Sequence, residues 1–354
     1  MDTLVPDRID PARRRFFGIA AAGIAAASLG LVAPHAQAAT PASNAPKPMT
    51  TTNRNLGPVK QIRAGVLDIG YVDAGPADGA PVILLHGWPY DIHSYAEVAP
   101  LLAARGYRVI VPYLRGHGST TFLSPDTFRN AQQYVVARDV VALLDALHIR
   151  RAVLAGYDWG SRTADIVAAL WPERVRALVS VTGYLITNRA ANETPIEPAR
   201  EWAWWYQYYF ATERGRLGLQ DEHYRKELAR VVWTFSSPTW RFDDATFDRT
   251  AAAFTNPDYA AIVLHNYRWR LGLADGDPRF DDVEARLAAG PKIAVPTVTI
   301  DGELDPFTPP GEGAGYRAMF TGPYDHRTFR GIGHNVPQEA PAAFARAVVD
   351  ADRL

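Results

Sequence analysis

Short apolar runs alternate with amphipathic stretches along most of the chain, from residue 59 onward. Residues 82–85 and 152–155 contain no polar side chain, as expected of strands buried on both faces of a parallel sheet. Between such runs, apolar residues recur three and four positions apart, and residues 131–147 show this helical spacing most clearly. The alternation predicts an α/β fold with a mostly parallel sheet flanked by helices.

One long segment, residues 185–290, breaks this alternation. It has helical patches but no apolar strand run, and it is rich in Trp, Tyr, Arg and Pro. The alternation resumes at residue 291 and closes with a predicted helix over residues 341–350. We therefore expect a core made of residues 59–184 and 291–354, interrupted by an inserted helical cap at residues 185–290.

The first 38 residues have the pattern of an export signal. Three arginines at residues 13–15 precede an apolar, alanine-rich run, and residues 36–38 offer the small residues that a signal peptidase requires. The arginines followed by Phe-Phe resemble a twin-arginine signal, which exports folded proteins. We expect cleavage after residue 38, a flexible lead-in at residues 39–58 and a periplasmic or secreted mature protein. The alternative is an uncleaved N-terminal anchor.

Composition narrows the possible chemistry further. The chain of 354 residues has no cysteine, which excludes disulfides, thiolate zinc sites, iron–sulfur ligation and a cysteine nucleophile. Its 37 basic and 38 acidic residues give a net charge of −1, which is unlike a nucleic-acid-binding protein or a polybasic membrane-binding one. We expect no nucleic-acid partner and no stable membrane insertion after the signal is cleaved. We also expect the protein to be a monomer or a homodimer.

The most informative motif is Gly-Tyr-Asp-Trp-Gly at residues 156–160, between a predicted buried strand and a predicted helix. Glycines on both sides of one polar residue at such a turn form a nucleophile elbow. Its central residue is Asp158 rather than serine, and Ser161 falls inside the predicted helix. Taken alone, this short pattern favours an aspartate that only caps the helix.

Three further segments follow predicted strands in the order that a catalytic triad would require. Residues 86–89 (His-Gly-Trp-Pro) form a predicted tight turn whose backbone N–H groups can face the elbow, and we expect His86 to support that turn. Asp305 follows a later strand, and His334 lies in a glycine-rich loop after the last strand. Nucleophile, acid and then histidine is the order of α/β-hydrolases. The joint pattern makes Asp158 the candidate nucleophile, Asp305 the group that orients the histidine, and His334 the base.

These motifs resemble those of α/β-hydrolases with an aspartate nucleophile, the branch that contains epoxide hydrolases and haloalkane dehalogenases. The resemblance extends from about residue 59 to the end of the chain and depends on residues 86–89 and 156–160. It implies the α/β-hydrolase fold with an inserted helical cap. The sequence departs from the family at Tyr113, where an acidic residue is common, and this concerns a loop rather than the triad.

The resemblance implies hydrolysis in two steps, with no metal and no organic cofactor. Asp158, ionised at neutral pH, would attack an sp³ carbon and form an alkyl ester. His334, oriented by Asp305, would then take a proton from the water that hydrolyses the ester. The backbone N–H groups of Trp88 and Trp159 would hold the oxyanion of that second step.

The leaving group separates the two activities of this branch. A halide departs as a stable anion, whereas an epoxide opens to an alkoxide and needs an acid beside its oxygen. Residues 204–210 resemble the epoxide-hydrolase cap segment in which a tyrosine precedes a glutamine, which assigns Tyr206 as one acid. Residues 265–269 resemble the segment with the second tyrosine, which assigns Tyr267. If this register is shifted, the substitutes are Tyr208, Tyr209 and Tyr259.

Alternatives remain open at this point. The cap tyrosines could serve only to pack the cap on the core. A dehalogenase could use Trp159 to bind halide, and six of the nine tryptophans lie in the cap. Trp88 favours an epoxide hydrolase, because dehalogenases tend to carry a polar residue there. An idle hydrolase fold that only binds a ligand would usually lack one triad member, and a serine esterase would need a serine at the elbow.

We therefore expect a hydrolase that uses water to open a small-molecule epoxide to a vicinal diol, with a haloalkane dehalogenase as the alternative. The residues expected to bind the substrate are aromatic, namely Trp88, Trp159, Tyr206 and Tyr267.

Overall fold

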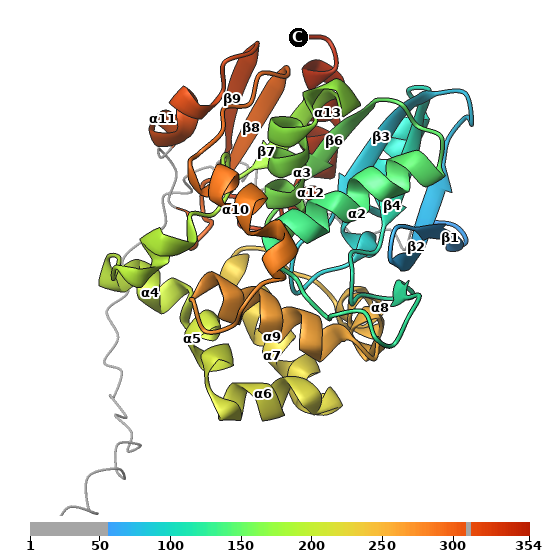
Figure 1. Cartoon of the computed structure of the whole chain (residues 1–354). Helices are drawn as coiled ribbons and strands as arrows, with labels where there is room; N and C mark the ends of the chain where they lie inside the picture. Colours follow the sequence, from blue (N-terminus) through green and yellow to red (C-terminus); the bar gives the residue numbers. More distant parts are fainter. Residues whose placement is uncertain (1–55, 309–312) are drawn as a thin grey trace, which may run out of the picture. The chain divides into compact units, whose positions relative to one another are not determined.

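The computed structural model describes residues 56–308 and 313–354. The predicted signal and nearly all of the predicted lead-in lie outside these described residues. A single mixed sheet of nine strands runs through the described part, in the order β1-β2-β4-β3-β6-β7-β8-β9, with the short β5 beside β2 (Figure 1). The strands are β1 (Lys60–Ala64), β2 (Leu67–Ala74), β3 (Ala80–Leu85), β4 (Tyr107–Pro112), β5 (Thr121–Phe122), β6 (Ala152–Gly156), β7 (Val175–Val181), β8 (Thr297–Gly302) and β9 (Tyr324–Phe329).

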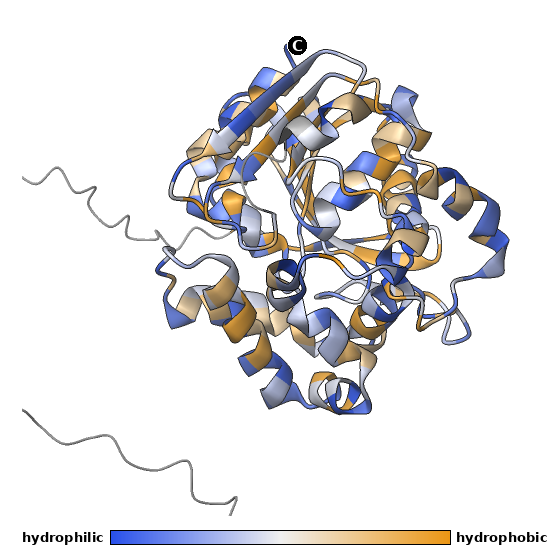
Figure 2. Cartoon of the chain, turned by 90° about the vertical axis from the view of Figure 1, so that its left-hand side faces the viewer, coloured by the Kyte–Doolittle hydropathy of each residue, from blue (hydrophilic) through white to orange (hydrophobic). Residues whose placement is uncertain are grey.

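The sheet is antiparallel at one end and parallel elsewhere. Strand β2 pairs antiparallel with β1, β4 and β5. The pairs from β4–β3 to β8–β9 are parallel, with Val82 opposite Val153 between β3 and β6. The central strands are covered on both faces, so the side chains of residues 82–85 and 152–155 are fully buried. Apolar colouring accordingly follows the strands through the interior (Figure 2). The predicted mostly parallel α/β sheet is confirmed.

Helices cover both faces of the sheet. Helices α2 (Gln133–Ala146) and α3 (Trp159–Leu170) pack on one face, and α1 (Val98–Ala103) and α13 (Pro341–Ala351) pack on the other (Figure 1). The core also contains shorter helical segments: η2 (Ile92–Tyr95), η3 (Pro172–Arg174), α11 (Gly313–Tyr316), η7 (Arg317–Met319) and α12 (Val336–Glu339).

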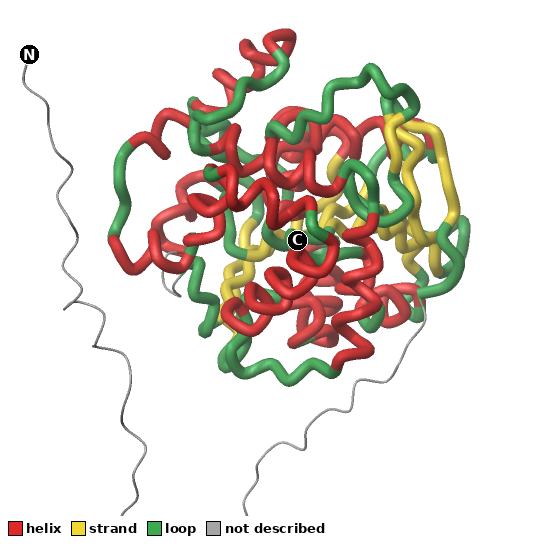
Figure 3. The backbone as a smooth tube through the Cα atoms, turned by 90° about the horizontal axis from the view of Figure 1, so that it is seen from below, coloured by secondary structure: helices red, strands yellow, loops and turns green. Residues whose placement is uncertain are grey.

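The segment between β7 and β8 is helical and adds no strand to the sheet. Its elements are η4 (Arg189–Glu193), α4 (Pro198–Ala203), α5 (Trp205–Ala211), α6 (Glu213–Gln220), α7 (Glu222–Ser236), α8 (Asp244–Ala251), η5 (Ala252–Thr255), α9 (Tyr259–Arg270), η6 (Pro278–Phe280) and α10 (Asp281–Ala288). Seen from below, helices lie in front of the yellow strands (Figure 3). No helix among the described residues is both long enough and apolar enough to cross a membrane.

Hydrogen bonds join these inserted helices to the loops at the carboxyl ends of the strands. The Trp233 indole donates to the carbonyl of Pro89 at 2.8 Å, in the loop after β3. The backbone N–H of His334, after β9, donates to the carbonyl of Ser236 at the end of α7, at 3.0 Å. Because parallel strands place their carboxyl ends at one edge, the turns after β3, β6, β8 and β9 meet beneath the inserted helices.

Candidate active site

Asp158 occupies the sharp turn between β6 and α3 in a strained backbone conformation. Its φ is 53° and its ψ is −122°, a region that non-glycine residues rarely adopt. The flanking glycine at position 160 is required by close packing, since a Cβ there would lie 1.9 Å from the Leu85 carbonyl oxygen. The Asp158 side chain makes no capping hydrogen bond to α3 and instead accepts the backbone N–H of Trp88 at 2.8 Å. The strand-to-helix turn is thus built to present this carboxylate, and a capping role is not observed.

The other two members of the predicted triad lie beside Asp158. Nδ1 of His334 is 2.7 Å from Oδ2 of Asp305, and the second oxygen of Asp305 accepts the Phe307 N–H at 2.9 Å. Nε2 of His334 lies 3.6 Å from Oδ2 of Asp158. The hydrogen bond to Asp305 fixes the imidazole ring and directs Nε2 toward Asp158.

The charges of this group are coupled. Burial alone would lower the pKa of His334, but the carboxylates of Asp305 and Asp158 outweigh it and raise that pKa to about 10. Burial alone would raise the pKa of Asp158, but His334 and the Trp88 N–H hold it below its ordinary value. Asp158 is therefore a carboxylate at neutral pH, paired with an imidazolium.

The turn after β3 holds the Trp88 N–H in place. The Leu114 N–H donates to Nε2 of His86 at 3.1 Å, so Nδ1 carries the proton and donates to the Gly87 carbonyl at 2.9 Å. Burial lowers the pKa of His86, which keeps the ring neutral. A Cβ at Gly87 would lie 2.6 Å from the Cβ of Asp158, so only glycine permits this approach. His86 thus has the structural contacts expected of it.

Tyr206 and Tyr267 face each other from helices α5 and α9. Their ring centroids are 5.4 Å apart, and both rings pack on Trp88, at 5.2 and 5.3 Å. The Trp159 indole donates to the Tyr267 hydroxyl at 3.3 Å, and the Tyr206 and Tyr267 hydroxyls share a hydrogen bond. Burial raises the pKa of both tyrosines, and the charge of Asp158 raises it further. Both phenols therefore remain protonated at neutral pH.

The three substitute tyrosines are held by other groups. Tyr208 is 40% exposed and donates to Glu201, and the Tyr209 hydroxyl donates to that of Tyr224 at 2.8 Å. The Tyr259 hydroxyl accepts the Trp88 indole N–H at 2.9 Å. The structure thus brings Tyr206 and Tyr267 together at Trp88 and Trp159, and holds Tyr208 and Tyr209 on Glu201 and Tyr224.

Tyr113, the departure from the family pattern, lies in the loop after β4. Its N–H donates to the Gly70 carbonyl at 2.8 Å, and its ring packs on Gly118, where a Cβ would lie 2.4 Å from a ring carbon. Tyr113 therefore shapes this loop.

Residues that the sequence did not single out also touch the site. The Phe307 ring meets the His334 ring edge-on at 4.8 Å, and the charge of Arg162 helps to lower the pKa of Asp158. Burial lowers the pKa of Arg162 to about 10. Its position four residues after Asp158, one turn along α3, was the only sequence signal available for it.

Glu339 in α12 anchors the loop that carries His334. One carboxylate oxygen accepts from the Ser237 hydroxyl at 2.6 Å and from the Asn335 N–H at 3.1 Å, and the other accepts from the Gly333 N–H at 2.8 Å. The backbone on both sides of His334 is thus tied to one half-buried side chain and, through Ser237, to the end of α7.

We expect Glu339→Gln to lower kcat about tenfold, because a glutamine amide has one acceptor oxygen for three donors. Steady-state kinetics would check this, with KM nearly unchanged, since Glu339 holds His334 rather than substrate. Glu303→Gln is the matched control, because Glu303 accepts the Gly331 N–H of the same loop at 2.7 Å but is exposed. Equal losses in both variants would contradict this positioning role.

The sheet order, the elbow and the acid–histidine pair define a hydrolase architecture, and sequence comparison agrees. Residues 80–341 match the model of the alpha/beta hydrolase fold family. The chain belongs to this family, and the resemblance found in the sequence is confirmed.

The similar proteins are named for one or the other of two activities. A solved structure from Klebsiella pneumoniae, described as that of a candidate epoxide hydrolase, is 58% identical with a TM-score of 0.81, over 84% of this chain and 97% of that one. A haloalkane dehalogenase of Mycobacterium marinum is 31% identical over 57% of this chain and 67% of its own length. Epoxide hydrolase B of Mycobacterium tuberculosis is 30% identical over 46% of this chain. The matched part spans about half, 49%, of that curated enzyme.

Proposed function

We propose that this protein is an epoxide hydrolase that converts a small-molecule epoxide and water to a vicinal diol through an ester on Asp158. The observation that carries the proposal is the pair of buried phenols, Tyr206 and Tyr267, packed on Trp88, whose backbone N–H binds Asp158. A phenol pair beside a carboxylate suits a substrate whose leaving oxygen stays attached and needs a proton. The likeness to relatives described as epoxide hydrolases supports the same assignment.

In the first step, Oδ2 of Asp158 attacks an epoxide carbon, because Oδ1 is held by the Trp88 N–H. A carbon–oxygen bond of the ring breaks as the ester bond forms. The epoxide oxygen takes its proton from Tyr206 or Tyr267, and the phenolate that results is reprotonated from solvent.

In the second step, His334 acts as the base. Ester formation removes the negative charge of Asp158, so His334 loses one of the two carboxylates that raise its pKa and gives up its proton more readily. The neutral ring, held by Asp305, takes a proton from a water that attacks the Asp158 carbonyl carbon. The oxyanion forms on Oδ1 at the N–H groups of Trp88 and Trp159, and the diol leaves with a proton as the carboxylate re-forms.

The dehalogenase alternative has less support from the geometry. Halide binding calls for free indole N–H donors, but the Trp88 indole donates to Tyr259 at 2.9 Å and the Trp159 indole donates to Tyr267 at 3.3 Å. Both donors already have a partner within the protein.

The assay that separates these functions supplies a terminal epoxide and a bromoalkane to the same preparation and quantifies diol and bromide. Diol formation without bromide release is the result expected of the proposed function. Bromide release without diol would overturn it in favour of a dehalogenase, and the absence of both products would overturn both assignments.

We expect the two steps to respond differently to pH. The pKa of Asp158 is lowered and those of the phenols are raised, so the rate of ester formation should stay flat from about pH 5 to about pH 9. Ester hydrolysis requires neutral His334, so its rate should rise with pH until it levels off below the value of about 10 that applies to the free enzyme. Rapid-mixing single-turnover kinetics at several pH values would check this. Ester formation that rises in parallel with hydrolysis would contradict it.

A further inference from the structure

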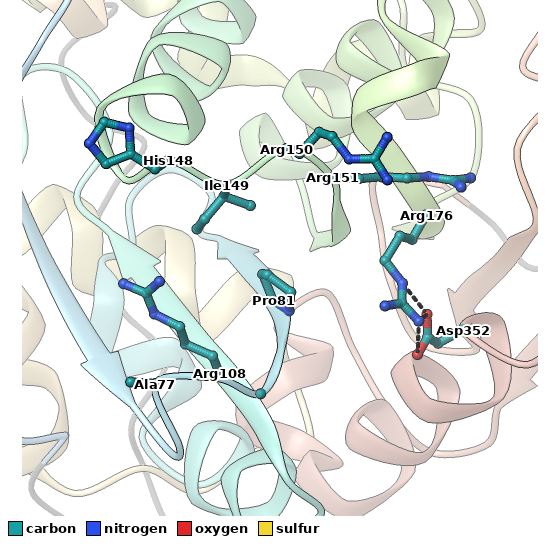
Figure 4. A pocket seen from close by; sticks show the side chains of 10 residues that line it. Ala77, Pro81, Arg108, His148, Ile149, Arg150, Arg151, Arg176 and Asp352 are labelled. Atoms are coloured by element: carbon teal, nitrogen blue, oxygen red, sulfur yellow. Dashed lines mark hydrogen bonds and ion pairs between the residues drawn. The ribbon is translucent and has the colours of Figure 1, made fainter.

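A polar cavity lies at the opposite end of the strands from Asp158. It has a volume of about 520 Å³ and lies at the amino-terminal ends of β3, β4, β6 and β7 (Figure 4). The candidate active site follows the carboxyl ends of β3, β6, β8 and β9, so the sheet separates the two. Six lining residues matter to its chemistry: Arg108, His148, Arg150, Arg151, Arg176 and Asp352.

Two of these arginines are held rigidly by aspartates. Arg108 donates two hydrogen bonds to Asp73, both at 3.1 Å, and Arg176 donates two to Asp352, at 3.0 and 3.1 Å. These paired hydrogen bonds to a carboxylate fix the planes of the two guanidinium groups. The two aspartates neutralise Arg108 and Arg176 and leave the charges of the other arginines unbalanced.

The two remaining arginines of the lining, Arg150 and Arg151, have no carboxylate partner among the described residues. Arg151 uses only its Nε, which donates to the Val175 carbonyl at 3.0 Å, and the Arg150 side chain has no hydrogen bond or ion pair in the described part. Arg150 and Arg151 are consecutive residues, and both line the cavity together with Arg176 and His148 (Figure 4). The chain as a whole carries a net charge of −1, so this positive charge is a local feature.

We propose that this cavity is a binding site for a small organic dianion or polyanion, such as a phosphate ester or a diphosphate. Planar guanidinium forks bind phosphoryl oxygens in pairs. Two arginines without a carboxylate partner, in the same lining as a third that Asp352 holds, suit a ligand with more than one charge. The volume lies in the range of small-molecule sites. A cavity lined by charged groups disfavours an apolar epoxide, so this site is distinct from the proposed catalytic one.

Isothermal titration calorimetry with inorganic pyrophosphate, at fixed ionic strength, tests the proposal on the full chain. We expect saturable binding of one pyrophosphate per chain, weakened about tenfold or more in Arg150→Gln/Arg151→Gln. The double variant Arg150→Lys/Arg151→Lys keeps the positive charge but loses the planar guanidinium groups. Its affinity for pyrophosphate should lie between that of the parent protein and that of the glutamine double variant. Arg63→Gln/Arg330→Gln is the matched control, because it removes the same charge from two exposed arginines outside the cavity.

Two results would overturn the proposal: binding that does not saturate, or equal weakening in the two glutamine double variants, which would show only diffuse attraction. Epoxide hydrolysis is measured on the same samples. Because the cavity is remote from Asp158, hydrolysis should be unchanged in all of them, and a failure of either assignment is visible independently of the other.

Discussion

The His334→Gln variant is expected to form the ester on Asp158 but release diol at least about 10³-fold more slowly than the parent protein. Glutamine cannot take a proton from water, whereas the attack by Asp158 needs no base. Rapid mixing with excess epoxide should therefore show a burst of one epoxide consumed per chain, followed by almost no diol.

His326→Gln is the matched control for this variant. His326 is half-buried and, like His334, lies beside an aspartate, since its Nε2 is 3.5 Å from Oδ2 of Asp301. It lies on β9 rather than in the loop beyond it. Turnover should persist in this control. Full turnover in His334→Gln would contradict the assigned role of His334.

The double variant Tyr206→Phe/Tyr267→Phe should lose epoxide opening by about 10³-fold, because no proton then reaches the departing oxygen. The rings and their packing on Trp88 are retained, so the thermal unfolding temperature should change little. Single-turnover kinetics would place the loss in ester formation, and each single variant should lose less, since the other phenol remains.

Tyr208→Phe/Tyr209→Phe provides the control. It also removes two hydroxyls, both from α5, the helix that carries Tyr206, and these hydroxyls bind Glu201 and Tyr224. This control should open epoxides at nearly the parental rate. If the rate of epoxide opening falls as much in this control as in Tyr206→Phe/Tyr267→Phe, the two acids are wrongly assigned.

Much of the core was predictable because strand and helix patterns are local. The helix predicted over residues 131–147 is α2, at residues 133–146, and the apolar run at 152–155 is β6. Residues 94–104 have the apolar spacing of a single helix, but the structure divides this region into η2 and α1. Asp91 accepts the His93 N–H and starts a separate turn, and Pro100, which has no N–H, is accommodated in the first turn of α1.

The parts of the site that short runs of consecutive residues form were predictable from the sequence. The turn of Asp158 and the loop of His334 each carry glycines that a sequence shows directly. Glu339 has no such marker, because its role depends on donors from Ser237 and Gly333 that only the folded chain brings together. Phe307 likewise gains its contact with His334 from the turn that follows Asp305.

The central proposal is that Asp158 forms a covalent ester with an epoxide. Its most direct test is the intact mass of His334→Gln after exposure to an equal mixture of a terminal epoxide and a bromoalkane of different chain length. The predicted result is an increase equal to the mass of the whole epoxide, located in the peptide that contains Asp158. An increase equal to the bare alkyl group would identify a dehalogenase, and no increase with either compound would contradict covalent catalysis at Asp158.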